Sequence, residues 1–233
     1  LGDCREVLPG LEPGYDICLT DPDYGIGKQE VHKDTGTVSY GEKFSPEVYG
    51  EVVWPMIEAA EALVENGWVW VWQSLTYHKH FADWFPRDYR LFASAKNFVI
   101  YRPTPVQWSW DPILFWPVGE PQKKPRPGHR DWMVSNTARQ FSTFKQFHPT
   151  HKQPDTCMYV AGTLCESKKL LDPFCGSGTA LVAAHRLGIA ATDIEIEEEY
   201  CEKTAKRLEE ETSQGVIRFG EEADKTTTIA MEL

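Results

Sequence analysis

A glycine-rich turn between a short apolar run and a helical pattern is the feature that most constrains the fold of this chain. The turn, Asp172-Pro173-Phe174-Cys175-Gly176-Ser177-Gly178-Thr179, follows a run at 169–172 that is typical of a buried strand and precedes a helical pattern at 179–187. A strand at 189–193 and a helix at 197–211 complete a β-turn-α-β-α run, the arrangement of one half of a doubly wound sheet. The sequence therefore predicts an α/β fold with a ligand-binding turn at a strand end.

The glycines of this turn let backbone amides approach a ligand, because no Cβ atoms stand in the way. The turn lacks the final Lys-Ser/Thr of a phosphate-binding loop and the third glycine of the dinucleotide fingerprint, which disfavours a nicotinamide-dependent dehydrogenase. Glu195 ends the next strand, where a carboxylate can accept hydrogen bonds from two ribose hydroxyls. A helix-capping role is the alternative for Glu195.

A second candidate site follows the apolar run 15–20, which predicts another buried strand. Asp21, Pro22 and Tyr24 then supply a carboxylate, a rigid backbone carbonyl and an aromatic ring. Two hydrogen-bond acceptors and an aromatic ring are the groups needed to bind the exocyclic amine of a flat base. Asp-Pro is also an ordinary turn initiator, so the tetrapeptide is weak evidence when taken alone.

The stretch between these sites contains a long helix and several strands. A polar, glycine-rich stretch at 25–45 predicts a mobile loop beside the site, and a helix is expected from Pro46, capped by Ser45, kinked at Pro55 and ended by Asn66-Gly67. Its apolar stripe consists of Tyr49, Val53, Ile57 and Ala60. Further strands are expected at 68–73, 89–93, 97–101 and 112–116, and further helices at 77–85 and 154–165. The alternating Trp68, Trp70 and Trp72 favour a core strand over a base-stacking surface.

The charge is unevenly distributed along the chain. The net charge is −11, which argues against phosphate contacts, but 117–152 holds seven basic residues against two acids, whereas 193–233 holds 13 acids against five bases. The acidic segment 193–233 is interpreted as a solvent-exposed helix face followed by a tail. The basic, proline-rich segment is the candidate for nucleic-acid contacts, and its basic residues before Lys152 are Lys123, Lys124, Arg126, Arg130, Arg139 and Lys145.

Length and composition set the outer limits of the chain. With 233 residues and 41% hydrophobic content, it can bury the core of a single domain. No apolar stretch has the length of a membrane span, and the first residues lack the features of a signal peptide, so a cytoplasmic location is expected. The six cysteines form no C-x-x-C pair, which disfavours a zinc site or a disulfide framework.

Five motifs, taken in order, resemble those of the amino-group DNA methyltransferases of the permuted β group. They are Gly2-Asp3-Cys4, Asp21 to Tyr24, His148-Pro149-Thr150-His151-Lys152, Asp172 to Thr179, and Ile194-Glu195-Ile196 with Tyr200. The resemblance implies a Rossmann-like, doubly wound, mostly parallel seven-stranded sheet, S-adenosylmethionine as cofactor and DNA as substrate. It also implies one permuted domain, with a catalytic half at 1–116, a target-recognition insert at 117–147, a cofactor half at 148–211 and an acidic tail at 212–233.

The resemblance assigns roles residue by residue. Asp21 and the Pro22 carbonyl would accept the amine hydrogens of a flipped base, and Tyr24 would stack on its ring. Phe174, Gly176 and Gly178 would line the methionine half of the cofactor, and Glu195 would hold its ribose. Asp3 and Cys4 would lie beside its adenine. The remaining cofactor-binding residues would be Asp21, Asp172, Ser177, Thr179, His148, Thr150 and Lys152.

The chain departs from the family pattern at two positions, and several functions stay open. Asp23 stands where the family usually has a second proline, and His151 where it usually has glutamine. Proline would pre-set the Pro22 carbonyl, so Asp23 supports a weakly active or regulatory DNA-binding subunit, which the intact turn and Glu195 oppose. The short insert suggests a brief target sequence, single-stranded DNA, or contacts from a homodimer or a second subunit.

The sequence also leaves open which atom of which molecule is methylated. Adenine-N6 methylation is favoured over cytosine-N4, because the N4 enzymes often carry Ser where Asp21 stands. Methylation of RNA or of protein glutamine uses a related motif that typically begins with Asn. Cytosine-C5 methylation needs a nucleophilic Cys after Pro, and the sequence has no Pro-Cys.

Overall fold

The computed structural model describes residues 1–23, 26–31, 38–42, 46–100, 105–106, 108–121, 128–135 and 152–213, without the side chains of 26–31, 38–42, 46–48, 97–100 and 213. Its strands are β1 (Tyr15–Thr20), β2 (Ile26–Val31), β3 (Val38–Glu42), β4 (Val64–Trp72), β5 (Arg90–Ile100), β6 (Trp108–Val118), β7 (Trp132–Ser135), β8 (Lys169–Asp172) and β9 (Ala190–Asp193). Its α-helices are α1 (Cys4–Val7), α2 (Pro46–Glu61), α3 (Phe81–Trp84), α5 (Pro154–Met158), α6 (Thr179–Leu187) and α7 (Glu198–Ser213). The other helical segments are the 3-10 helices η1 (Leu8–Gly10) and η2 (Leu75–His80) and the π-helical η4 (Tyr159–Leu164).

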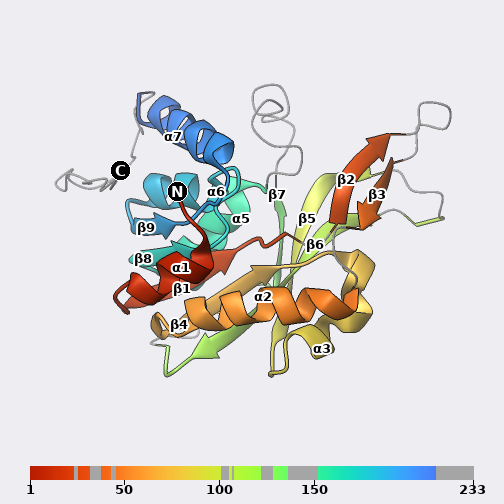
Figure 1. The fold of residues 1–233 in the computed structure, drawn as a ribbon, viewed down its shortest axis with the longest axis horizontal. Helices are drawn as coiled ribbons and strands as arrows, with labels where there is room; N and C mark the ends of the chain where they lie inside the picture. The colour runs from red at the N-terminus through yellow and green to blue at the C-terminus, as the bar shows by residue number, and fades with distance from the viewer. Residues whose placement is uncertain are drawn as a thin grey trace.

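A central sheet organises the molecule (Figure 1). In the described part of the chain it has seven strands in the order β7-β5-β6-β4-β1-β8-β9. Strand β6 runs antiparallel to β4 and β5, and every other neighbouring pair is parallel. Helices α1 and α2 cover one face and α5 and α6 the other. The predicted α/β, doubly wound and mostly parallel seven-stranded sheet is confirmed.

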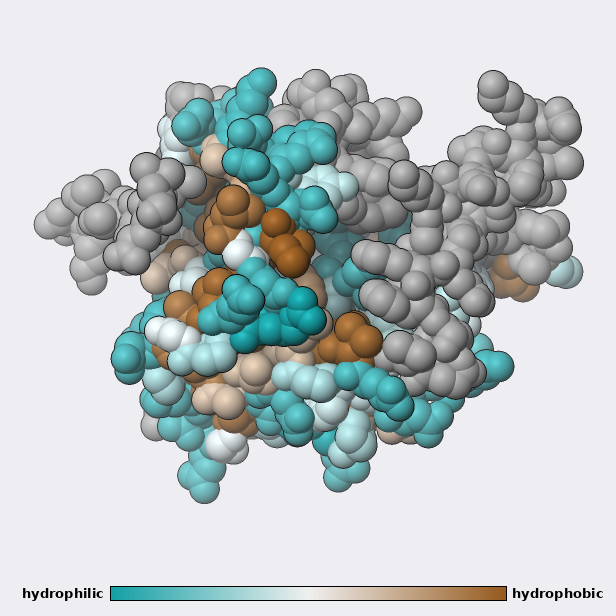
Figure 2. All heavy atoms as spheres, viewed as in Figure 1, coloured by the Kyte–Doolittle hydropathy of each residue, from teal (hydrophilic) through white to brown (hydrophobic). Residues whose placement is uncertain are grey.

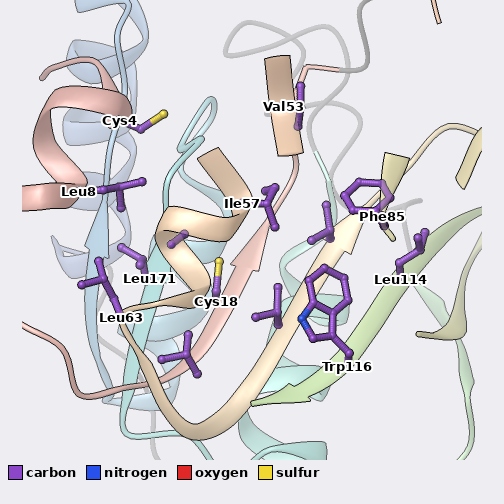
Figure 3. Packing of buried hydrophobic residues seen from close by; sticks show 14 of the residues in the cluster. Cys4, Leu8, Cys18, Val53, Ile57, Leu63, Phe85, Leu114, Trp116 and Leu171 are labelled. Atoms are coloured by element: carbon purple, nitrogen blue, oxygen red, sulfur yellow. The ribbon is translucent and has the colours of Figure 1, made fainter. Parts of the chain in front are cut away.

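Each face of the sheet has its own hydrophobic core. On one face α2 buries the predicted stripe, in which Tyr49 is 1% exposed, Val53 4%, and Ile57 and Ala60 0%. Figure 3 shows side chains from α1, α2 and the sheet gathered in this core. On the other face α5, η4 and α6 pack over Trp70 and Trp72, which are each 2% exposed. The prediction that the tryptophans of β4 belong to the core is confirmed for these two, and Trp68 is partly buried against the same cluster.

The connections diverge between β1 and β8, and this places the candidate site. From β1 the chain passes through α2 to β4, whereas from β8 it passes through α6 to β9, on the opposite side of β1. The two strands are parallel neighbours, with Cys18 opposite Leu171. In open α/β sheets ligands bind at the carboxyl ends of the strands where such connections diverge. Asp21 follows β1 at this point, and the glycine turn follows β8.

Two predictions for the first half of the chain are wrong. The stretch 25–45 contains the antiparallel pair β2 and β3 instead of only loop, and this pair lies apart from the main sheet (Figure 1). Its strands are joined by local backbone hydrogen bonds, which need no hydrophobic alternation in the sequence. Asn66-Gly67 lies inside β4 instead of ending the helix, which already ends at Glu61. Asn66 has φ 49°, and a Cβ on Gly67 would lie 2.0 Å from the Asp16 carbonyl oxygen.

The remaining differences are two strands that form one, a strand that was not predicted, and elements whose bounds differ. The two strands expected at 89–93 and 97–101 are one strand, β5, with irregular pairing to β6 between Ala95 and Ile100. Part of the expected insert at 117–147 is β7, which pairs with β5 at the sheet edge. Strand β6 extends beyond 112–116, the helix at 77–85 is η2 followed by α3, and that at 154–165 is α5 followed by η4. Strands β1, β8 and β9 and helices α6 and α7 agree with prediction within two residues.

Among the described residues, no helix has both the length and the hydropathy that a membrane span requires.

Candidate active site

A hydrogen bond between two buried side chains ties the ends of β1 and β8 together. Thr20 Oγ1 donates to Asp172 Oδ1 at 2.5 Å, and the same carboxylate oxygen accepts the backbone N–H of Phe174 at 3.0 Å. Thr20 is 1% exposed and Asp172 4%. The residue before Asp21 is thereby fixed to the residue that opens the glycine turn.

Acidic groups are concentrated at this edge of the sheet, and the buried ones resist ionisation. Burial raises the pKa of Asp172 to about 7, and the nearby Asp21 and Glu195 carboxylates act in the same direction, against the hydrogen bonds from Thr20 and Phe174. Asp193 lies opposite Asp172 across β8 and β9, and burial together with that neighbour raises its pKa as well. A positively charged ligand bound at this edge would favour the ionised form of these carboxyls and would in turn be stabilised by it.

The two glycines of the turn serve different purposes. Both have left-handed backbones, with φ 52° at Gly176 and 68° at Gly178. A Cβ on Gly178 would lie 2.3 Å from Thr204 Cγ2, so this glycine permits the close approach of α7. Among the described residues, a Cβ on Gly176 would meet only the Phe174 carbonyl oxygen, at 3.9 Å. Gly176 thus borders space that no described residue fills, where a bound ligand can approach the backbone.

The carboxylate of Glu195 braces the turn from the next strand end. Its Oε2 accepts the Gly176 N–H at 2.7 Å, and its Oε1 accepts the Glu197 N–H at 2.9 Å. Glu195 is 9% exposed. The bond from the Glu197 N–H to Oε1, directly before α7, agrees with the helix-capping alternative for that one oxygen. Each carboxylate oxygen still has a second lone pair that can accept a hydrogen bond from a ribose hydroxyl.

Lys152 brings the two candidate sites into contact. Its Nζ lies 2.6 Å from Asp21 Oδ2, and its backbone carbonyl accepts a hydrogen bond from Thr179 Oγ1 at 3.2 Å. The Lys152 side chain is 13% exposed and that of Asp21 29%. Pro22 is buried and Asp23 is exposed. Asp21 and the glycine turn are thus connected through Lys152.

The first residues of the chain run beside Glu195. The Gly2 N–H donates to the Glu195 carbonyl oxygen at 2.7 Å. Asp3 caps α1 by accepting the Arg5 N–H at 2.9 Å and pairs with the Arg5 guanidinium, which lowers the pKa of Asp3 to about 2. Cys4 is buried, and its thiol contacts Met56 at 3.5 Å. The backbone at Asp3 and Cys4 is therefore near the predicted ribose carboxylate, although both side chains are engaged locally.

Several predicted site residues lie outside the described part of the chain. In the catalytic and cofactor sets these are Tyr24, His148 and Thr150, and in the basic segment Lys123, Lys124, Arg126, Arg139 and Lys145. The cap residue Ser45 also lies outside it. Arg130 is described: it is exposed, and its guanidinium lies 4.8 Å from the centre of the Trp132 ring at the sheet edge.

Three residues at this site were given no individual role by the sequence analysis, although Ile196 is part of the fifth motif. Ile196 follows Glu195 and is 59% exposed, and Figure 2 shows hydrophobic residues on the surface between α7 and α1. Thr204 and Arg207 on α7 are 5% and 2% exposed and contact the glycine turn from behind. In the sequence, Ile196 is an apolar residue between acidic ones, and this pattern could have marked it as a candidate ligand contact. The helical pattern alone marks neither Thr204 nor Arg207, because their contacts depend on how α7 packs.

Comparison with known proteins connects this site to a family. Residues 118–207, which include the glycine turn and Glu195, match the family model of the N6/N4 type described as DNA methylase. A type II methyltransferase, M2.DpnII of Streptococcus pneumoniae, is 27% identical over 90% of this chain and 88% of its own length.

Solved structures share the fold along nearly the whole chain. The complex of M1.HpyAVI with SAM has a TM-score of 0.61 and 19% identity, covering 89% of this chain and 96% of that one. TTHA0409 of Thermus thermophilus, complexed with S-adenosyl-L-methionine, has a TM-score of 0.57 and 18% identity, covering 91% and 94%. The cytosine-N4-specific PvuII DNA methyltransferase has a TM-score of 0.66 and 14% identity, covering 91% and 89%. The resemblance that the five motifs indicate is confirmed.

Proposed function

We propose that this chain, a relative of the amino-group DNA methyltransferases, transfers a methyl group from S-adenosylmethionine to the N6 amine of an adenine base that is flipped out of DNA. The observation that carries the proposal is the meeting of Asp21 with the glycine turn at the point where the sheet connections diverge. The Thr20–Asp172 hydrogen bond of 2.5 Å and the Lys152–Asp21 pair at 2.6 Å hold the two parts together. A carboxylate for an amine and a turn for a cofactor are the parts that such a transfer needs.

The residues around the turn fit S-adenosylmethionine. Open space at Gly176 admits the cofactor next to the backbone, the Glu195 oxygens can accept ribose hydroxyls, and the exposed Ile196 offers an apolar surface to adenine. The surrounding carboxylates complement its sulfonium and ammonium charges. When bound, this cofactor supplies a methyl group that the sulfonium already activates. The other proposed contacts come from Asp3, Cys4, Asp21, His148, Thr150, Lys152, Asp172, Phe174, Ser177, Gly178 and Thr179.

Asp21 and Pro22 are the proposed catalytic groups. The lone pair of an exocyclic amine is delocalised into the base, so the amine is a poor nucleophile. The Asp21 carboxylate and the Pro22 carbonyl would accept its two hydrogens out of the ring plane and favour an attacking, tetrahedral nitrogen. The Asp21 carboxylate is also the nearby acceptor for the proton that the methylated nitrogen loses. Positioning therefore replaces a strong base.

DNA binding is assigned to the face around the carboxyl ends of the strands. A target amine inside a duplex is out of reach, so the base must be extruded, and stacking on Tyr24 would offset about 1–3 kcal/mol of lost stacking. The basic segment, of which Arg130 is described at the sheet edge, is proposed to contact phosphates. A homodimer or a second subunit that supplies further contacts remains a prediction.

Two alternatives have specific support. The family model covers both N6 and N4 chemistry, so cytosine-N4 methylation is the second candidate, and Asp21 in place of Ser favours adenine. Asp23 supports a regulatory subunit of low activity, because it is exposed and leaves the backbone after Pro22 freer than a second proline would. The braced glycine turn argues for a working cofactor site.

A binding and transfer experiment tests the proposed function. The full chain should bind S-adenosylmethionine in calorimetry and transfer labelled methyl groups to DNA, but not to RNA or protein. Cofactor binding without transfer to any DNA would favour the regulatory subunit. Absence of both binding and transfer would refute the assignment.

A further inference from the structure

We propose that Arg207 on α7 is a positioning residue that holds the cofactor turn and connects it, through Thr179, to the Lys152–Asp21 pair. This inference rests on the proposed function, because it concerns how the same site aligns cofactor and target amine. It assigns to α7, a helix outside the strand-end loops, a part in both cofactor binding and methyl transfer.

The guanidinium of Arg207 bonds to the turn at two places. Its Nη1 donates to the Ser177 carbonyl oxygen at 2.6 Å and to Thr179 Oγ1 at 3.4 Å. Arg207 is 2% exposed, and a buried charge is costly unless its hydrogen bonds compensate. The planar guanidinium can reach a carbonyl and a hydroxyl from one fixed position, whereas a lysine ammonium on a flexible stem cannot hold that geometry equally well.

Thr204 makes a parallel contact from the same face of α7. It lies three positions before Arg207, and its Oγ1 donates to the Gly176 carbonyl oxygen at 3.1 Å. Two successive carbonyls of the turn therefore point toward α7. In a trans peptide the N–H points opposite to the C=O, so anchoring the Gly176 carbonyl directs the Ser177 N–H away from α7. The helix thus fixes the orientation of two successive peptide planes of the turn.

Thr179 extends this contact network to the proposed catalytic group. Its Oγ1 accepts from Arg207, lies 3.1 Å from Ser177 Oγ, and donates to the Lys152 carbonyl oxygen at 3.2 Å. Lys152 Nζ in turn contacts Asp21 Oδ2 at 2.6 Å. A shift of the Arg207 side chain therefore affects both the turn and the position of Asp21.

The chain offers a matched control on the same pair of helices. Arg186 on α6 forms a two-point ion pair with Glu211 on α7, with bonds of 3.0 and 2.6 Å. This pair joins the two helices, but no bond from it to the glycine turn or to Lys152 occurs among the described contacts. Arg186→Lys therefore tests whether weaker helix packing alone alters the site.

Arg207→Lys and Arg186→Lys are compared first, after wild-type cofactor binding has been established. We expect Arg207→Lys to raise the Kd for S-adenosylmethionine about 10- to 100-fold, the equivalent of one hydrogen bond to a charged group, and Arg186→Lys to leave it within about twofold. Equal Kd values for Arg207→Lys and wild type would overturn the proposal. Failure of the wild type to bind the cofactor would instead overturn the proposed function itself.

Thr179 provides the test if Arg207→Lys does not fold, and it separates positioning from packing. Thr179→Val removes the hydroxyl that reaches Lys152, whereas Thr179→Ser keeps it. We expect kcat for methyl transfer to DNA to be about tenfold lower in Thr179→Val than in Thr179→Ser, with a smaller change in KM for the cofactor. Equal kcat values in the two variants would contradict the connection to Asp21.

Discussion

Lys152 Nζ lies 2.6 Å from Asp21 Oδ2, which joins two residues 131 positions apart in the sequence. Asp21 belongs to the motif that follows β1, and Lys152 stands two positions before α5, beside the glycine turn through its contact with Thr179. Because both side chains are mostly buried, the ammonium restrains the carboxylate more firmly than a surface pair would. The proposed cofactor site and the proposed amine acceptor are therefore in contact through Lys152.

Asp21→Ala should lower methyl transfer about 100- to 1000-fold, because it removes one of the two groups that orient the amine. Cofactor binding should persist with only a modest rise in Kd, because Asp21 is one of many proposed cofactor contacts and the turn and Glu195 are braced without it. Labelled transfer to DNA and calorimetry with S-adenosylmethionine measure the two effects. A fully active Asp21→Ala variant would remove Asp21 from the mechanism.

Lys152→Met should lower kcat, because the Asp21 carboxylate loses the partner that fixes its orientation. The effects of Lys152→Met and Asp21→Ala on kcat should not add, since a contact that is already broken cannot be lost twice. A double-mutant cycle measures this coupling. Additive effects would show that the two residues act separately.

Gly178→Ala should destabilise the fold by about 1–3 kcal/mol, because the backbone is left-handed and the new methyl would collide with Thr204. Its Cβ would lie 2.3 Å from Thr204 Cγ2, so Thr204→Ser, which lacks that methyl, should restore part of the loss. Denaturant unfolding measures both variants. Gly176→Ala is the control, because Gly176 shares the positive φ without the collision with Thr204. This variant should unfold at a higher denaturant concentration than Gly178→Ala, but it should bind the cofactor weakly.

Asp172→Asn should weaken the pH dependence of stability. Burial raises the pKa of Asp172 to about 7 in the folded state, so its contribution to stability is complete below the ordinary pKa of about 4 and is lost as pH rises through about 7. Asparagine keeps an oxygen for Thr20 and Phe174 but carries no charge. The fall in Tm between about pH 5 and about pH 8 should therefore be smaller in the variant. An equal fall would mean that Asp172 is not the titrating group.

The sequence predicts best the elements whose signals are local. Helix α6 agrees at both ends with the predicted 179–187, because the glycines that flank it have left-handed backbones that mark its limits. Strand β7 was missed because four residues beside a proline-rich stretch carry no period, and only pairing with β5 makes them a strand. The prediction that Asn66-Gly67 ends a helix was wrong, because the turn-like backbone of Asn66, with φ 49°, lies within strand β4.

The site was predictable where chemistry stands in the sequence as a motif. Asp21, the glycine turn and Glu195 were all named, and the structure brings them to one edge of the sheet. Arg207 and Thr204 were not, since their contacts arise from the packing of α7 behind the turn. Side chains that act from behind a site have no motif of their own.

Identification of the methylated nucleoside tests the central claim most directly. The full chain is incubated with methyl-labelled S-adenosylmethionine and DNA, and the DNA is then digested and its nucleosides separated. The account predicts label in the N6-methyladenine nucleoside and its loss with Asp21→Ala. Label in N4-methylcytosine would contradict the adenine assignment, and DNA without label would contradict the proposal that this chain is a methyltransferase.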